Sequence, residues 1–211
     1  MSEQALDAVL AERGLTLIAY YQPNCAAAQD AAGKAMVLKL IAQERDEFER
    51  EAGFAQLAAQ HGIAPALHEA RWLADRDAGL LVLERWDLSL EELLARPSLC
   101  VEALRRVQRA LRRVLRALRQ IGVVHADLLP KNIVVRLRGG RVDAVALIDW
   151  GLSFYAAEVG AAWWLGALVV YFAQLRSWPG HSAAALQAAP HLLDRHILLE
   201  LDLELDLLRA K

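Results

Sequence analysis

Residues 123–135 read VVHADLLPKNIVV and residues 146–151 read ALIDWG, and most of the functional signal of the chain lies in these two stretches. They contain two short apolar segments, 133–137 and 144–148, which predict strands joined by a Gly-Gly turn. Polar residues come directly before the first segment and directly after the second. Because the two strands form a hairpin, we expect these polar side chains to meet at its mouth.

The residue types at this mouth indicate phosphoryl transfer. Asp127, Asn132 and Asp149 offer a carboxylate that can accept the proton of an acceptor hydroxyl, and oxygen ligands for Mg²⁺ on ATP phosphates. The spacing Asp-x-x-x-x-Asn followed by Asp-x-Gly is that of the catalytic loop and magnesium motif of protein kinases. His125 has two interpretations, a core histidine that shapes the loop or a proton carrier, and we favour the first.

The first 86 residues predict a small α+β unit, and the remainder predicts a mainly helical one. In the first unit we expect strands over 15–21, 34–41, 66–73 and 80–83, a helix over 42–61, and a long turn over 22–34. In the second we expect a short helix capped by Asp87 and Ser89 and ending at Leu94, and a long helix from Pro97 to about Gln120.

The order of these elements resembles the protein-kinase-like superfamily over roughly residues 15–155. Lys39 at the end of MVLK is similar to the lysine that pairs with ATP phosphates, and the following helix is similar to the one whose glutamate holds that lysine. We choose Glu51 because it lies on the helix side of Phe48, with Glu47 as the alternative. The segment LVLERW, with Glu84 and Trp86, is similar to the hinge that holds adenine.

This resemblance implies one minimal two-lobed domain of the α+β class. Residues 1–86 would be the N-lobe and 87–211 the C-lobe, with ATP and Mg²⁺ between them. Asp127 would be the base, Asn132 and Asp149 would bind the metal, and Lys39 with Glu51 would hold the phosphates.

The chain departs from regulated protein kinases in three respects. Its phosphate-covering turn holds one glycine, Ala126 replaces arginine, and only 60 residues follow Gly151, with no Ala-Pro-Glu after Asp149. The HADL and IDWG motifs are instead similar to the small atypical branches, namely lipopolysaccharide sugar kinases, aminoglycoside and choline phosphotransferases, and RIO- and Bud-type kinases. We therefore expect a sugar, small-molecule or glycolipid acceptor, with a compact Ser/Thr protein kinase or a pseudokinase binding module as the alternatives.

Composition narrows the class of protein further. The 211 residues include 24 basic and 26 acidic ones and two cysteines, which argues against a disulfide framework and against general nucleic-acid binding. The N-terminus is acidic where a secretory signal would be basic, so we expect a cytoplasmic protein. The apolar run 159–173 is too short to span a bilayer, which leaves at most a peripheral membrane contact. The alternation of Leu with acids over 199–207 leaves the form of that segment open.

The predicted long helix carries arginines along one side. They recur at three- and four-residue steps from Arg105 to Arg119, opposite a leucine and valine face. A solvated outer face, paired with acids of the 200–206 segment, would explain this pattern. The functional interpretation is docking of an anionic glycolipid or an acidic protein on Arg109, Arg112 and Arg116.

Overall fold

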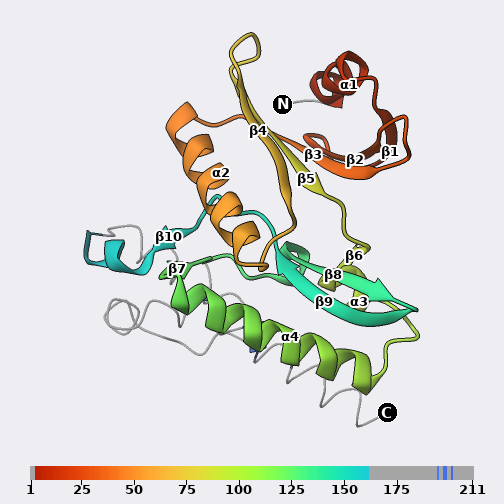
Figure 1. Cartoon of the computed structure of the whole chain (residues 1–211), viewed down its shortest axis with the longest axis vertical. Helices are drawn as coiled ribbons and strands as arrows, with labels where there is room; N and C mark the ends of the chain where they lie inside the picture. Colours follow the sequence, from red (N-terminus) through yellow and green to blue (C-terminus); the bar gives the residue numbers. More distant parts are fainter. Residues whose placement is uncertain (1–2, 162–193, 195–196, 199–200, 202–211) are drawn as a thin grey trace. The chain divides into compact units, whose positions relative to one another are not determined.

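The computed structural model describes residues 3–161, 194, 197–198 and 201, and it separates into two units, 1–86 and 87–211 (Figure 1). The first unit consists mainly of strands. The longer described helix of the second unit comes after these strands in the sequence. The α+β class expected from the sequence is confirmed.

A five-stranded sheet forms the first unit. Each strand is antiparallel to its neighbours, and the order across the sheet is β1-β2-β3-β5-β4. The strands are β1 (Thr16–Gln22), β2 (Cys25–Gln29), β3 (Ala35–Ile41), β4 (Leu67–Leu73) and β5 (Ala78–Glu84).

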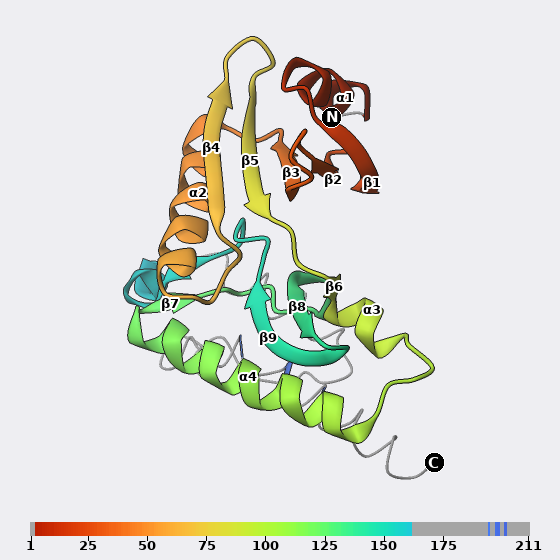
Figure 2. The same ribbon diagram turned by 45° about the vertical axis from the view of Figure 1, so that its right-hand side comes forward.

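Helices cover both faces of this sheet. Alternation along β3 turns Leu38 and Leu40 to one face, where α1 (Glu3–Glu12) completes the larger apolar core. Lys39 and Ile41 belong to the opposite face, against which α2 (Arg45–Gln60) packs with Phe48. Figure 2 shows α2 running beside β4, as the contacts between these elements require.

Two features of this unit differ from the sequence prediction. The expected long turn over residues 22–34 is wrong, because β2 occupies its middle and pairs with both β1 and β3. Strand β2 contains Ala26, Ala27 and Ala28, all fully buried, and small residues of low strand preference give no sequence signal for a central strand. Helix α1 was not expected at all.

The described part of the second unit contains helices and two small sheets. A capping box between Ser89 and Glu92 begins α3 (Leu90–Leu94), which confirms Ser89 as a cap. Asp87, the other expected cap, instead accepts the Leu137 N–H with its Oδ2. Strands β6 (Leu88–Ser89), β8 (Ile133–Arg138) and β9 (Arg141–Leu147) form one sheet, and β7 (Val123–Val124) pairs with β10 (Phe154–Tyr155). Short 3₁₀ helices cover Pro130–Asn132 and Ala156–Ala161.

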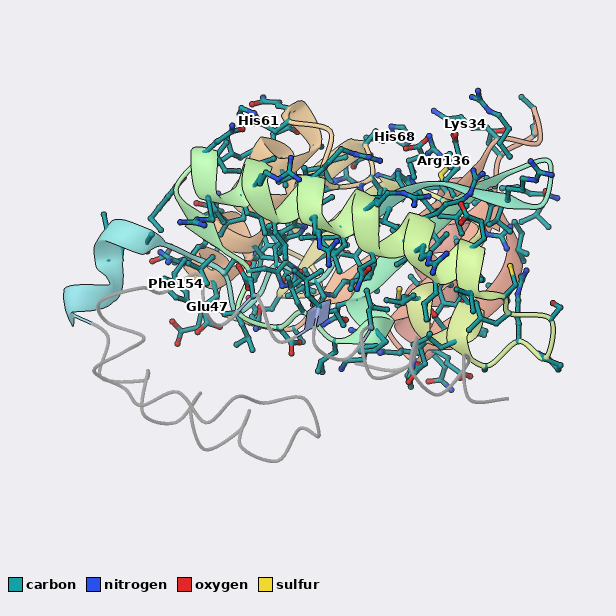
Figure 3. The ribbon with its side chains drawn as sticks, turned by 90° about the horizontal axis from the view of Figure 1, so that it is seen from below. Lys34, Glu47, His61, His68, Arg136 and Phe154 are labelled. Carbon is teal, nitrogen blue, oxygen red and sulfur yellow. The ribbon has the colours of Figure 1, made fainter. Side chains whose placement is uncertain are left out.

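Helix α4 (Val101–Gln120) packs along β9 with its apolar face. It begins later than the Pro97 start that we expected, because Leu99 N–H bonds the Arg96 carbonyl in a separate turn and Cys100 is the N-cap. Figure 3, seen from below, shows α4 in front of the β8–β9 hairpin that carries Arg136.

Two expectations fall wholly or largely outside the described residues. These are the buried helix over the apolar run 159–173, of which only 159–161 are described, and the form of the 199–207 segment, of which only Leu201 is described. Within the part of the chain that the structure describes, no helix combines the length and apolar character needed to cross a bilayer.

Candidate active site

The sheet of the first unit holds an ion pair at the predicted position. Lys39 Nζ lies 2.9 Å from Glu51 Oε1, and Glu51 is only 4% exposed. Glu47, the alternative partner, is exposed one turn earlier on α2, and Figure 3 labels it. Burial on the Phe48 side of α2 therefore selects Glu51, whereas contact of Lys39 with phosphate remains a prediction.

The turn between β1 and β2 lies within residues 22–34, where the resemblance placed the phosphate-covering turn. It contains only Pro23 and Asn24, so the hairpin is far tighter than we expected. Asn24 Nδ2 donates to the Leu40 carbonyl at 2.8 Å, and Leu40 N–H donates back to the Asn24 carbonyl at 2.8 Å. These two hydrogen bonds to β3 hold the turn in place, although the turn contains no glycine.

The predicted hinge residues lie at the end of β5. Trp86 Nε1 donates to Glu84 Oε2 at 3.1 Å, and Glu84 N–H donates to the Ala66 carbonyl at 2.8 Å. Both side chains are half-buried. Their contact with adenine remains a prediction.

His125 organises the catalytic loop of the second unit. Its Nδ1 accepts the Asp127 N–H at 3.3 Å, which makes Nε2 the donor to the Ile148 carbonyl at 3.0 Å. Its ring also meets that of Trp150 edge-on, with centroids 4.7 Å apart. Because both ring nitrogens bond the backbone of the two motifs, His125 joins the HADL loop to the residue that precedes Asp149.

Asp127 is buried, and one of its carboxylate oxygens is held in place. Asn132 Nδ2 donates to Asp127 Oδ2 at 2.8 Å and to the Asp127 carbonyl at 2.9 Å. The other oxygen, Oδ1, has no hydrogen-bond partner among the described residues. Burial raises the pKa of Asp127, Lys131 lowers it, Asp149 raises it, and the Asn132 bond lowers it. A buried acceptor atom without a partner is suited to take a proton from a substrate.

Asp149 lies two residues after the end of β9 at Leu147. The Ile148 N–H donates to the Asn132 carbonyl at 3.0 Å, so both motifs are fixed to each other at this point. Ala126 and Asp149 have φ values of 64° and 67°, in the left-handed region that residues with side chains rarely adopt. Backbone strain of this kind is typical of functional sites.

Asp194 stabilises the strained loop and was missed by sequence reasoning. Its two carboxylate oxygens accept the N–H groups of His125 at 2.9 Å and Ala126 at 2.8 Å. Asp194 is 2% exposed, and burial raises its pKa to about 7 against the lowering effect of the two bonds. The only signal in the sequence is an acid inside the apolar stretch HLLDRHILL, 69 residues after His125.

The donor set in the second unit fits Mg²⁺. The amide nitrogen of Asn132 is used by Asp127, which leaves its oxygen for a cation, and Asp149 supplies a carboxylate. Among the described residues there is no group of three or more His, Cys, Asp or Glu side chains that could hold a metal. Two protein oxygens agree with Mg²⁺, which keeps several waters and binds substrate phosphates.

The predicted site residues thus fall into two sets. Lys39, Glu51, Glu84 and Trp86 belong to the first unit, and Asp127, Asn132 and Asp149 to the second. A strand-borne lysine with a helical glutamate, and a loop with a buried aspartate followed by Asp-Trp-Gly, define the protein-kinase-like class.

Comparison with known families gives the particular member of this class. Residues 42–167 match the model of the phosphotransferase enzyme family, APH, which belongs to the protein-kinase-like superfamily. The chain therefore belongs to this phosphotransferase family and is a kinase-type enzyme in general. No curated protein matched the chain.

Proposed function

We propose that the chain transfers the γ-phosphoryl group of ATP to an alcohol. The observation that carries this proposal is the buried Asp127 carboxylate, with Oδ2 fixed by Asn132 and Oδ1 without a partner among the described residues. An oriented oxygen of this kind can accept the hydroxyl proton as the acceptor oxygen bonds to phosphorus.

The other residues would bind the nucleotide. Asn132 and Asp149 would hold Mg²⁺, which when bound neutralises charge on the β- and γ-phosphates. Lys39, kept in place by Glu51, would contact the phosphates, and Glu84 with Trp86 would contact adenine.

The acceptor is proposed to be a sugar, a small molecule or a glycolipid hydroxyl. Membership of the phosphotransferase family supports this choice over a protein acceptor. An anionic glycolipid would dock on Arg109, Arg112 and Arg116, with an acidic protein carrier as the alternative. We propose a cytoplasmic location with peripheral membrane contact.

The test is transfer of label from γ-³²P-ATP. Purified protein with Mg²⁺ is incubated with the protein fraction, the small-molecule fraction and the lipid fraction of a lysate. We expect label in the small-molecule or lipid fraction. Label confined to proteins would contradict the acceptor class, and the absence of ATP consumption in all fractions would contradict the reaction.

Two variants separate the proposed roles in this assay. Asp127→Asn should bind Mg-ATP normally but lose about 10²- to 10⁴-fold in transfer rate, because only the base is removed. Asp149→Asn should weaken the Mg²⁺-dependent part of ATP binding itself. Undiminished transfer by Asp127→Asn would reject the assignment of the base.

A further inference from the structure

Helix α4 carries an unusual excess of positive charge. It contains seven arginines and one glutamate, while the whole chain has a net charge of −2. The rest of the chain therefore has eight more negative than positive charges. When the protein approaches a negatively charged surface, the surface attracts the positive charge of α4 and repels the rest of the chain.

The structure changes which arginines are available for docking. Glu102 Oε1 accepts from Arg106 Nε at 3.2 Å and from Arg109 Nη2 at 3.1 Å, so these two side chains are engaged within the helix. Arg105, Arg112, Arg113, Arg116 and Arg119 are exposed, and their side chains form no hydrogen bond or ion pair with the described residues. We define the arginine face as Arg105, Arg112, Arg116 and Arg119, which the helical repeat places on one side.

The arginine face is an extended line of charge rather than a compact cluster. From Arg105 to Arg119 the charges follow a straight line of about 21 Å at 1.5 Å per residue. The leucines and valines of α4 from Leu104 to Leu118 are all buried, so this part of α4 exposes none of its own large apolar side chains beside the arginines. A protein interface normally has an apolar or aromatic centre, which this face lacks.

A nucleic acid fits the face less well than a flat surface does. The apolar half of α4 is packed on β9, and proteins that read single strands add exposed aromatic side chains for stacking. A bilayer with anionic headgroups offers phosphates over a plane, and each arginine near such a surface adds attraction at physiological ionic strength.

We propose that the arginine face of α4 is a docking surface for an anionic lipid bilayer. This inference deepens the partner part of the proposed function, and it moves the centre of the contact from Arg109 to Arg112, Arg116 and Arg119. Vesicle binding needs no ATP, so its failure would leave phosphoryl transfer untouched, and loss of transfer would leave vesicle binding untouched.

The experiment is co-sedimentation of the full chain with vesicles. Pure phosphatidylcholine vesicles are compared with vesicles containing about 30 mol% phosphatidylglycerol at roughly 0.1 M salt. We expect binding to the anionic vesicles only, and its loss at high salt. Equal binding to both vesicles, or no binding to either, would overturn the proposal.

Variants test whether α4 is responsible. Replacing Arg112, Arg116 and Arg119 by Gln should weaken binding about a hundredfold, at roughly fivefold for each arginine. The matched control replaces Arg96, Arg138 and Arg141 by Gln, which removes the same charge from exposed sites elsewhere in the second unit and should retain binding. An equal loss in this control would overturn the proposal in favour of net charge alone.

Two further measurements distinguish loss of charge from misfolding, and a bilayer from a nucleic acid. A variant with Lys at positions 112, 116 and 119 should bind anionic vesicles almost as the wild type does, because charge is retained, whereas a folding defect would not be rescued. Tight binding of duplex DNA without any binding to vesicles would instead assign the face to nucleic acid.

Discussion

At the scale of single residues, the ion pair of the first unit depends on which carboxylate of α2 lies next to Lys39. Glu51 is buried and paired with Lys39, and Glu47 is exposed. We predict that Glu51→Gln raises the KM for ATP about tenfold or more, since a lost charge-assisted hydrogen bond is worth about 1.5–3 kcal/mol. Glu47→Gln is the matched control and should leave steady-state kinetics unchanged. A larger effect of Glu47→Gln would place the pairing one turn earlier.

Lys131 influences the ionisation of Asp127. The exposed ammonium group lowers the pKa of Asp127, which burial raises. The base must be ionised to accept a proton, so activity falls as the pH drops through this pKa. Lys131→Met should raise the pKa and move the acidic limb of the kcat/KM profile to higher pH, by less than about one unit because an exposed charge is screened. Arg138→Met, which removes a charge that is 86% exposed, is the control.

Asp194 links the catalytic loop to the pH dependence of stability. Its folded-state pKa of about 7 lies above the ordinary 3.8, so its stabilising contribution is complete below pH 3.8 and is lost as pH rises through 7. Within that window the free energy of unfolding should fall by up to about 1.4 kcal/mol per pH unit through this group.

The variant Asp194→Asn tests this linkage by denaturant unfolding at pH 5, 6, 7 and 8. At pH 5 it should be less stable than the wild type by about 1–3 kcal/mol, because the amide group cannot accept both N–H donors. The difference should shrink as pH rises. A difference that stays constant across this range would contradict the shifted pKa. Asp143→Asn, on the exposed side of β9, shows the effect of the same change at the surface.

At the scale of elements, α2 packs closely against the sheet because Gly79 of β5 has no side chain at the contact. A Cβ atom added to Gly79 of β5 would lie 2.0 Å from the Phe48 ring, which also packs against Trp72 with centroids 5.8 Å apart. Only glycine permits this contact, and it determines how closely α2 brings Glu51 to Lys39.

We predict that Gly79→Ala destabilises the protein by about 1–3 kcal/mol, the range for overpacked cores, and raises the KM for ATP by displacing α2. Gly53→Ala is the control on the exposed side of the same helix, where nothing lies within 4 Å. It should be neutral or stabilise by up to about 1 kcal/mol. Equal effects of the two substitutions in denaturant unfolding would contradict this account of the packing.

At the scale of the whole molecule, local signals predicted most of the fold and distant contacts account for the misses. The apolar strands around Lys39 and the hairpin after Asn132 have clear periodicity, and the α+β class followed from them. Strand β2 was missed because alanine has little preference for strands. Its small side chains nevertheless fit the core where β2 is buried under α1.

The candidate site shows the same division. Asp127, Asn132 and Asp149 occur in motifs with fixed spacing, so sequence alone named them, and burial then distinguished Glu51 from Glu47. Asp194 has no motif, because its function is to bind backbone N–H groups 68 and 69 residues away. A side chain that bonds to backbone N–H groups places no requirement on the types of the residues that carry them. The sequence therefore shows no sign of such a contact.

This long-range link gives a prediction for the C-terminal region as a whole. Asp194, Ile197 and Leu201 are at most 2% exposed, so these three residues contribute two hydrogen bonds and two buried apolar side chains. Truncation after residue 193 should therefore remove about 4 kcal/mol or more, at about 1.5–3 kcal/mol for each apolar side chain. It should also abolish activity, because the backbone N–H groups of His125 and Ala126 lose their acceptor. Truncation after Leu201 is the matched control, since every one of these contacts is retained, and it should keep most of the stability and the transfer activity. Thermal unfolding and the labelled-ATP assay of both truncated proteins provide the comparison. If the shorter protein were as stable and active as the longer one, Asp194 would not hold the catalytic loop.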